Sequence, residues 1–146
     1  MTTRIVIYAD KNKPGGEEIM SSLVNELKAL EIGTVETITE ESLPTTLSGI
    51  DLETIALIVS IARLGVDAAK LITAVIETTR ENRRRYADRK KVDSNSVSKN
   101  SLLLMEEDTI KASLDIPSEK PADEKKFINL FTELREKDEA AGNSNN

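Results

Sequence analysis

The loop at residues 10–16, with the sequence DKNKPGG, is the first stretch whose residue types could do chemistry. It lies between an expected strand and an expected helix, where α/β proteins often hold a phosphate group. Its spacing fits neither the P-loop nor the dinucleotide-binding fingerprint. A glycine pair after a proline more often marks only a turn, so we assign no cofactor to this loop.

A second group that could do chemistry is the run of carboxylates Glu106, Glu107 and Asp108. Three consecutive side chains rarely converge on one metal ion, and an acidic hairpin tip commonly serves solubility. The chain has no cysteine and no histidine, so it lacks a thiolate nucleophile and the commonest general base and transition-metal ligand. No serine has a plausible base. We therefore predict a protein that is not an enzyme, without catalytic residues, metal or cofactor.

The third group is a basic segment at residues 80–91. It holds seven lysines and arginines against Glu81 and Asp88, a local charge of +5, which leaves −11 for the rest of a chain whose net charge is −6. Such polarity favours orientation toward a partner or a surface. The candidate partner-binding residues, which we call the arginine tract, are Arg80, Arg83, Arg84, Arg85 and Arg89.

Nucleic acid is not an expected partner of this tract. Consecutive arginines on a helix point around its axis in steps of about 100°, so they cannot all face one groove of a duplex. Aromatic residues for base stacking are nearly lacking, since the chain has two Tyr, two Phe and no Trp. A solvated cationic helix end and a contact with an anionic membrane surface both remain as alternatives.

The elements that must position the tract are expected to be helices at residues 52–91. Residues 52–64 are apolar on nearly every side, which predicts a buried helix. Gly65 interrupts it, and Asp67 is a suitable N-cap for a second helix. Beyond Glu77 the apolar face ends, so we expect this helix to project into solvent through the arginines. The apolar stripe before that point consists of Leu71, Ile72, Val75, Ile76 and Thr79.

The apolar residues 55–76 are long enough to cross a bilayer, but we do not expect them to do so. Arg63, Asp67 and Lys70 lie within this stretch. On insertion scales each costs about 2.5 to 3.5 kcal/mol, at least as much in total as the aliphatic residues return. The first residues also lack the features of a signal peptide, and we expect a cytoplasmic protein.

The remaining segments predict the fold class. Residues 3–9 and 34–39 read as strands on either side of a helix that begins near residue 17, and they are expected to be parallel. Residues 102–105 and 109–116 read as a hairpin, followed by a helix that Asp123 caps. The predicted fold is α+β, a two-layer β-α-β-(α-α)-β-β-α arrangement with a small mixed sheet, and a ferredoxin-like sheet is one candidate topology. We expect a single domain over residues 1–138, with a long helical excursion at 52–91, a flexible polar loop at 92–101 and a disordered tail at 139–146.

The order of these segments resembles a known family. The opening TRIVIYAD, the helix ending LKAL, the stretch ETIALIVSIARLGVDAAKLITAVIETTRENRRR and the closing LLLMEEDTIKASLDIP with KKFINLFTEL are similar to the effector-associated constant components of bacterial conflict systems. The resemblance implies a non-catalytic signalling or assembly role beside peptidases and large NTPases. It marks Arg83, Arg84, Arg85, Phe127 and Phe131 as family features.

These observations together predict a non-enzymatic adaptor of a bacterial defence or signalling system. Its expected partner is an effector protein such as a peptidase or an NTPase-associated component, or a second copy of the chain. Docking is expected through the apolar helices, the basic helix end or the exposed edge of the hairpin. The alternative is a peripheral membrane-surface adaptor bound through the arginine tract.

Overall fold

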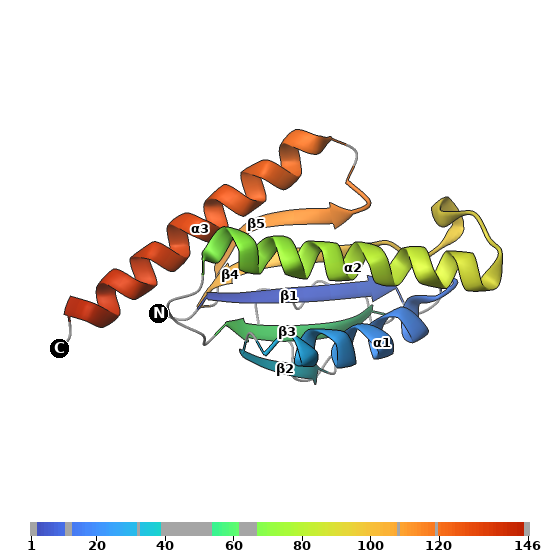
Figure 1. The fold of residues 1–146 in the computed structure, drawn as a ribbon, viewed down its shortest axis with the longest axis horizontal. Coiled ribbons are helices and arrows are strands. Elements are labelled where there is room, and N and C mark those ends of the chain that lie inside the picture. Colours follow the sequence, from blue (N-terminus) through green and yellow to red (C-terminus); the bar gives the residue numbers. More distant parts are fainter. Residues whose placement is uncertain are drawn as a thin grey trace.

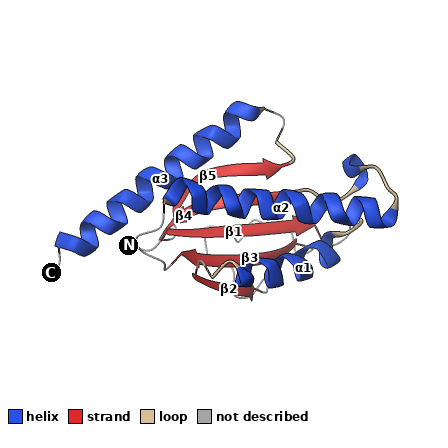
Figure 2. Cartoon of the chain, viewed as in Figure 1, coloured by secondary structure: helices blue, strands red, loops and turns tan. Residues whose placement is uncertain are grey.

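The structure, a computed structural model, describes residues 3–10, 13–31, 33–38, 54–61, 67–107, 109–118 and 120–144, with the backbone alone at residues 10, 37–38, 54–61 and 138–144. These residues form five strands and three long helices (Figures 1 and 2). Their bounds are β1 (Thr3–Asp10), α1 (Gly16–Ala29), β2 (Gly33–Ile38), β3 (Thr54–Ile61), α2 (Ala68–Lys90), the short 3-10 helix η3 (Ser94–Ser96), β4 (Asn100–Glu106), β5 (Thr109–Ile116) and α3 (Pro121–Ser144).

The strands form one sheet in the order β2-β3-β1-β4-β5, and every neighbouring pair is antiparallel. The elements from β1 to β4 follow the β-α-β-β-α-β order of ferredoxin-like folds, and β5 and α3 are added after it. The predicted α+β class is therefore confirmed. The expected mixed sheet is wrong, because β3 lies between β1 and β2 and pairs antiparallel with both.

The helix expected at residues 52–64 is also wrong, because Thr54–Ile61 is strand β3. Its sequence, TIALIVSI, is a short apolar run rich in β-branched residues, and periodicity alone cannot separate a fully covered strand from a buried helix. The helical excursion thus shrinks to α2. Asp67 caps α2 as expected, since its Oδ1 accepts a hydrogen bond from the backbone N–H of Ala69 at 2.9 Å. Gly65, expected to break the helix, lies outside the described residues.

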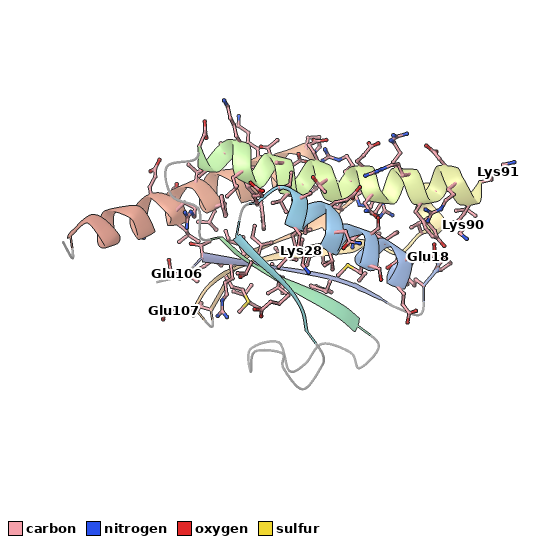
Figure 3. The ribbon with its side chains drawn as sticks, turned by 60° about the horizontal axis from the view of Figure 1, so that its bottom comes forward. Glu18, Lys28, Lys90, Lys91, Glu106 and Glu107 are labelled. Atoms are coloured by element: carbon pink, nitrogen blue, oxygen red, sulfur yellow. The ribbon has the colours of Figure 1, made fainter. Side chains whose placement is uncertain are left out.

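The hydrophobic core lies between the sheet and the three helices, which all cover the same face (Figures 1 and 3). On the sheet side the core takes alternate residues of the strands, such as Ile5 and Ile7 of β1 and Leu102 and Leu104 of β4. The helices contribute stripes at helical spacing, which is why amphipathic segments were recognisable in the sequence. The buried helical residues of this cluster are Met20, Leu23, Leu27, Leu71, Ile72, Val75, Ile76, Phe127, Phe131 and Leu134.

The hairpin β4–β5 places β5 at one edge of the sheet, where β4 is its only bonded neighbour among the described strands. Its expected alternation holds at the end of the strand, where Leu114 and Ile116 are buried, and fades at its start, where Ile110 is 41% exposed. α3 follows β5, and its first turns lie beyond this edge (Figure 1). α3 continues to Ser144, so the expectation of a disordered tail is wrong for residues 139–144.

Candidate interaction surfaces

Arg83, the centre of the arginine tract, is buried and not on the surface. Its side chain is 6% exposed. Nε donates a hydrogen bond to the carbonyl oxygen of Ser98 at 3.0 Å, and Nη2 donates to the carbonyls of Ser94 at 3.1 Å and Val97 at 3.3 Å. Burial lowers the pKa of Arg83 from its ordinary value. The guanidinium therefore binds the chain's own polar loop, which contains η3 and ends one residue before β4, so the expected loop bounds of 92–101 are wrong for residues 100–101.

Arg85 and Arg89 face α1. Arg85 forms an ion pair with Glu26, whose carboxylate also accepts a hydrogen bond from the Asn82 amide at 2.6 Å. Arg89 pairs with Glu18 at 3.1 Å. Figure 3 shows Glu18 beside Lys90 at the end of α2, and these two charged groups are 3.9 Å apart. Two acidic residues on α1 thus neutralise the side of α2 that faces it.

Arg80 and Arg84 have carboxylate partners as well. Arg80 pairs with Glu77 on α2 and with Glu124 on α3. Arg84 pairs with Glu81 and, at 2.9 Å, with Asp88. The hydrogen bond from Arg84 lowers the pKa of Glu81, and the same bond raises the pKa of Arg84. Every arginine of the tract therefore already has a partner within the chain.

The end of α2 also packs against other elements, so it does not project into solvent as expected. Ala87 is buried with Ile19 of α1 and Val97, and the ring of Tyr86 packs against this small cluster. Thr79 and Asn82 are buried too. Lys91 ends the helix in a left-handed conformation, φ 54° and ψ 44°, and marks its exposed tip (Figure 3). The basic segment joins α2 to α1, α3 and η3.

The loop before α1 packs closely against a side chain of α2 at Gly15. Gly15 has φ +83°, and a Cβ built there would lie 2.6 Å from Cε1 of Tyr86. Residues 11–12 of this loop lie outside the described residues. Where the structure describes the loop, Gly15 allows the start of α1 to lie close to the end of α2, because it has no side chain to clash with the Tyr86 ring.

The acidic hairpin tip is at the opposite end of the molecule from Lys90 and Lys91 (Figure 3). The backbone carbonyl of Glu107 accepts a hydrogen bond from Arg4. Asp108 lies outside the described residues. Among the residues with described side chains, no three acidic groups are placed to hold a metal ion.

A further surface hollow lies between β5 and α3, and the ion pairs of the described residues involve none of its lining residues. A hollow of about 420 Å³ runs along the sheet edge there. β5 and the turn after it supply apolar and hydroxyl groups, and α3 supplies the facing wall. The lining residues are Lys99, Ala112, Ser113, Leu114, Asp115, Pro117, Ser118, Asp123, Lys126, Phe127 and Leu130.

Sequence reasoning named the hairpin edge but missed the residues of this hollow. Lys99 and Lys126 are 27 positions apart and belong to segments with no shared motif. The one signal was the alternation of Ala112 and Leu114 with Ser113 and Asp115, which indicated a strand with one covered face. Phe127, named as a family feature, lines the hollow and is 2% exposed, whereas Phe131 is fully buried in the core.

Comparisons with known proteins add no assignment. No family model matches the chain, and searches of the curated proteins and of the solved structures find no match. The resemblance to effector-associated constant components thus stays a prediction. None of the helices that the structure describes combines the length and hydropathy that a membrane span needs.

Proposed function

We propose that this chain is a non-enzymatic adaptor of a bacterial defence or signalling system that docks an effector protein through the β5 edge of its sheet. The observation that carries the proposal is the outer edge of β5, which pairs with no other described strand and lies beside an open hollow. An edge strand presents unpaired backbone N–H and C=O groups, which readily pair with a strand from another chain.

The distribution of charge supports the same choice of surface. Five arginines that could have bound a partner are engaged by the chain's own carboxylates and carbonyls. A partner that bound these guanidinium groups would compete with these contacts. The membrane-surface alternative relies on the same arginines and has correspondingly less support.

The exposed apolar side chain at the start of β5 is the second support. Ile110 and Val92 are the large hydrophobic side chains exposed among the described residues, at 41% and 42%. Ile110 lies on the edge strand, where a docked strand would cover it. Val92 lies between α2 and η3 and belongs to no strand.

These two residues give a matched test. The chain is co-expressed with the products of its adjacent genes, and complexes are measured by size-exclusion chromatography with light scattering. We expect a complex with a neighbouring effector that Ile110→Lys abolishes and Val92→Lys leaves intact, because a lysine on an edge strand opposes strand pairing. A monomer that binds no neighbour would contradict the proposal, and so would equal effects of the two variants.

A further inference from the structure

We propose that the segment docked at β5 is an amphipathic strand without net charge, in which a basic residue precedes an acidic one by four positions. It adds antiparallel to β5, with its apolar face toward α3 and its two charges opposite Asp115 and Lys111. This inference rests on the proposed function and specifies the chemistry of the bound segment. Its evidence is the outer edge of β5, the wall that α3 forms and the order of charges along β5.

The backbone of β5 favours an extended, antiparallel segment. β4 is the only described strand that pairs with β5, so alternate residues of β5 direct N–H and C=O groups toward the hollow. Every neighbouring pair in the sheet is antiparallel, and antiparallel pairing is slightly more stable per residue than parallel pairing. The first turns of α3 lie beyond the edge (Figure 1), so an added strand has one face toward this helix.

The lining of the hollow favours an apolar face on the segment and no net charge. Ala112 of β5 and Leu130 of α3 are half-buried and line the hollow. Successive side chains of a strand point to opposite faces, so every second side chain of the segment lies toward these two residues. The charges of the lining balance, because it holds two lysines and two aspartates, namely Lys99, Lys126, Asp115 and Asp123.

The other face of the segment meets two exposed charges of β5. Lys111, Ser113 and Asp115 are exposed and alternate with residues that pack against the core under the helices. They therefore share the face of β5 that points away from the helices. Lys111 forms no ion pair with a described residue, and Asp115 accepts a hydrogen bond from the neutral Ser101 Oγ at 2.7 Å. Both charges can thus pair with an added strand.

Lys111 makes the edge selective. The pairing register skips this residue between Leu104 and Met105 of β4, so β5 has a β-bulge there. A bulge and a lysine both disfavour strand addition at the edge of a sheet. A segment that pairs there therefore needs an acid opposite Lys111 to offset the lysine, and a base opposite Asp115. In an antiparallel segment the base comes first, and the acid follows four positions later.

β5 of a second copy has the same order of charges, but it fits this edge less well. Two β5 strands paired antiparallel about a two-fold axis would place both copies of α3 on the same side of the joined sheet. Each α3 already extends past its own edge (Figure 1), so the two helices would compete for the same space. A segment without a helix above it avoids this conflict, so we assign the bound strand to the effector.

The test uses two fluorescein-labelled synthetic peptides with blocked ends and fluorescence anisotropy. The first peptide reads valine, lysine, valine, threonine, valine, glutamate, valine, and the second exchanges the lysine and the glutamate. Both have the same composition and net charge, so a difference in affinity reports the order of the charges alone. We expect the first peptide to bind at least about fivefold more tightly, because opposite charges across a strand pair are favourable and like charges are not.

Matched variants of the chain complete the test. Lys111→Asp plus Asp115→Lys exchanges the two charges of β5 and should reverse the preference between the peptides. Glu133→Lys plus Lys137→Glu exchanges two exposed charges of α3 outside the lining and should leave the preference unchanged. Methylation of one alternate set of backbone amides in the first peptide should abolish binding, whereas methylation of the other set should not, because only one set faces β5.

The outcomes separate this inference from the proposed function. Equal affinity for the two peptides, tighter binding of the second, binding of both methylated peptides, or self-association through β5 would each overturn the inference. If neither peptide binds but Ile110→Lys still abolishes the effector complex, the docking edge stands and the assigned order of charges is wrong. If the complex is absent as well, both proposals fail.

Discussion

Arg83 on α2 donates a hydrogen bond from Nε to the carbonyl oxygen of Ser98, 3.0 Å away. The two residues lie on either side of η3, and the same guanidinium also binds the carbonyls of Ser94 and Val97. A single buried cation thus satisfies three acceptors of the loop that leads into β4. The central arginine of the basic segment therefore holds the loop in place.

Replacing Arg83 should therefore destabilise the fold strongly. Arg83→Met leaves three carbonyls without their donor, and bonds to charged groups contribute about 1.5 to 3 kcal/mol. We expect the free energy of unfolding to fall by about 2 to 4 kcal/mol, as measured by urea denaturation. Arg84→Met, the same change one residue along on an exposed side chain, should cost less than about 1 kcal/mol. Equal losses for the two variants would show that the burial of Arg83 contributes nothing.

The pKa of Glu81 can be used to test the exposed ion pair between Glu81 and Arg84. Its hydrogen bond with Arg84 lowers that pKa, so the contribution of the pair is present above the ordinary carboxyl value and is lost as the pH falls through the lowered one. In Arg84→Met, the Glu81 pKa measured by carbon-13 NMR titration should rise toward its ordinary value. Arg80→Met, which removes a different pair, should leave the Glu81 pKa unchanged. A pKa that stays low in Arg84→Met would contradict this assignment.

Gly15→Ala tests the contact between the loop before α1 and the end of α2. The added Cβ would lie 2.6 Å from the Tyr86 ring, at a backbone φ of +83°. We expect a loss of about 1 to 3 kcal/mol in the free energy of unfolding, from overpacking and from the left-handed backbone. Adding Tyr86→Ala should remove the clash but keep the backbone cost, so the two losses should be less than additive. If the two losses in the free energy of unfolding were strictly additive, the Tyr86 ring would not lie against Gly15.

The membrane-surface alternative has its own test, because α1 supplies the carboxylates that neutralise Arg85 and Arg89. We expect the wild-type chain not to float with phosphatidylserine vesicles in a density gradient. Glu18→Gln plus Glu26→Gln should free both arginines and produce flotation that salt reverses. Salt-sensitive flotation of the wild-type chain would favour the membrane-surface adaptor over the docking edge.

The sequence predicted the elements whose signal is local. The period-two pattern of β1 and β5, the N-cap Asp67 and the stripe from Leu71 to Ile76 all identified their elements. β3 was missed because its apolar run lacks a period that could distinguish a strand from a helix. The antiparallel sheet was missed with it, since β3 is the strand between β1 and β2.

The placement of the arginine tract depended on contacts that are distant in sequence. Arg85 meets Glu26 across 59 residues, and Arg89 meets Glu18 across 71. A count of charges within residues 80–91 shows an excess of +5 and cannot include acids that the fold brings from α1. The hollow beside β5 also depends on residues distant in sequence, because Lys99 and Lys126 line it together through the packing of α3 on the sheet.

The most direct test of strand addition at β5 is amide hydrogen exchange by NMR, in the free chain and in its complex with the neighbouring effector. New hydrogen bonds slow the exchange of the amides that form them. The structure predicts new protection at alternate residues between Ile110 and Ile116 and shifted resonances around Lys126 and Phe127, with residues 80–91 unchanged. Protection confined to residues 80–91, with β5 unaffected, would contradict docking at β5. It would indicate that the arginine tract is the docking surface.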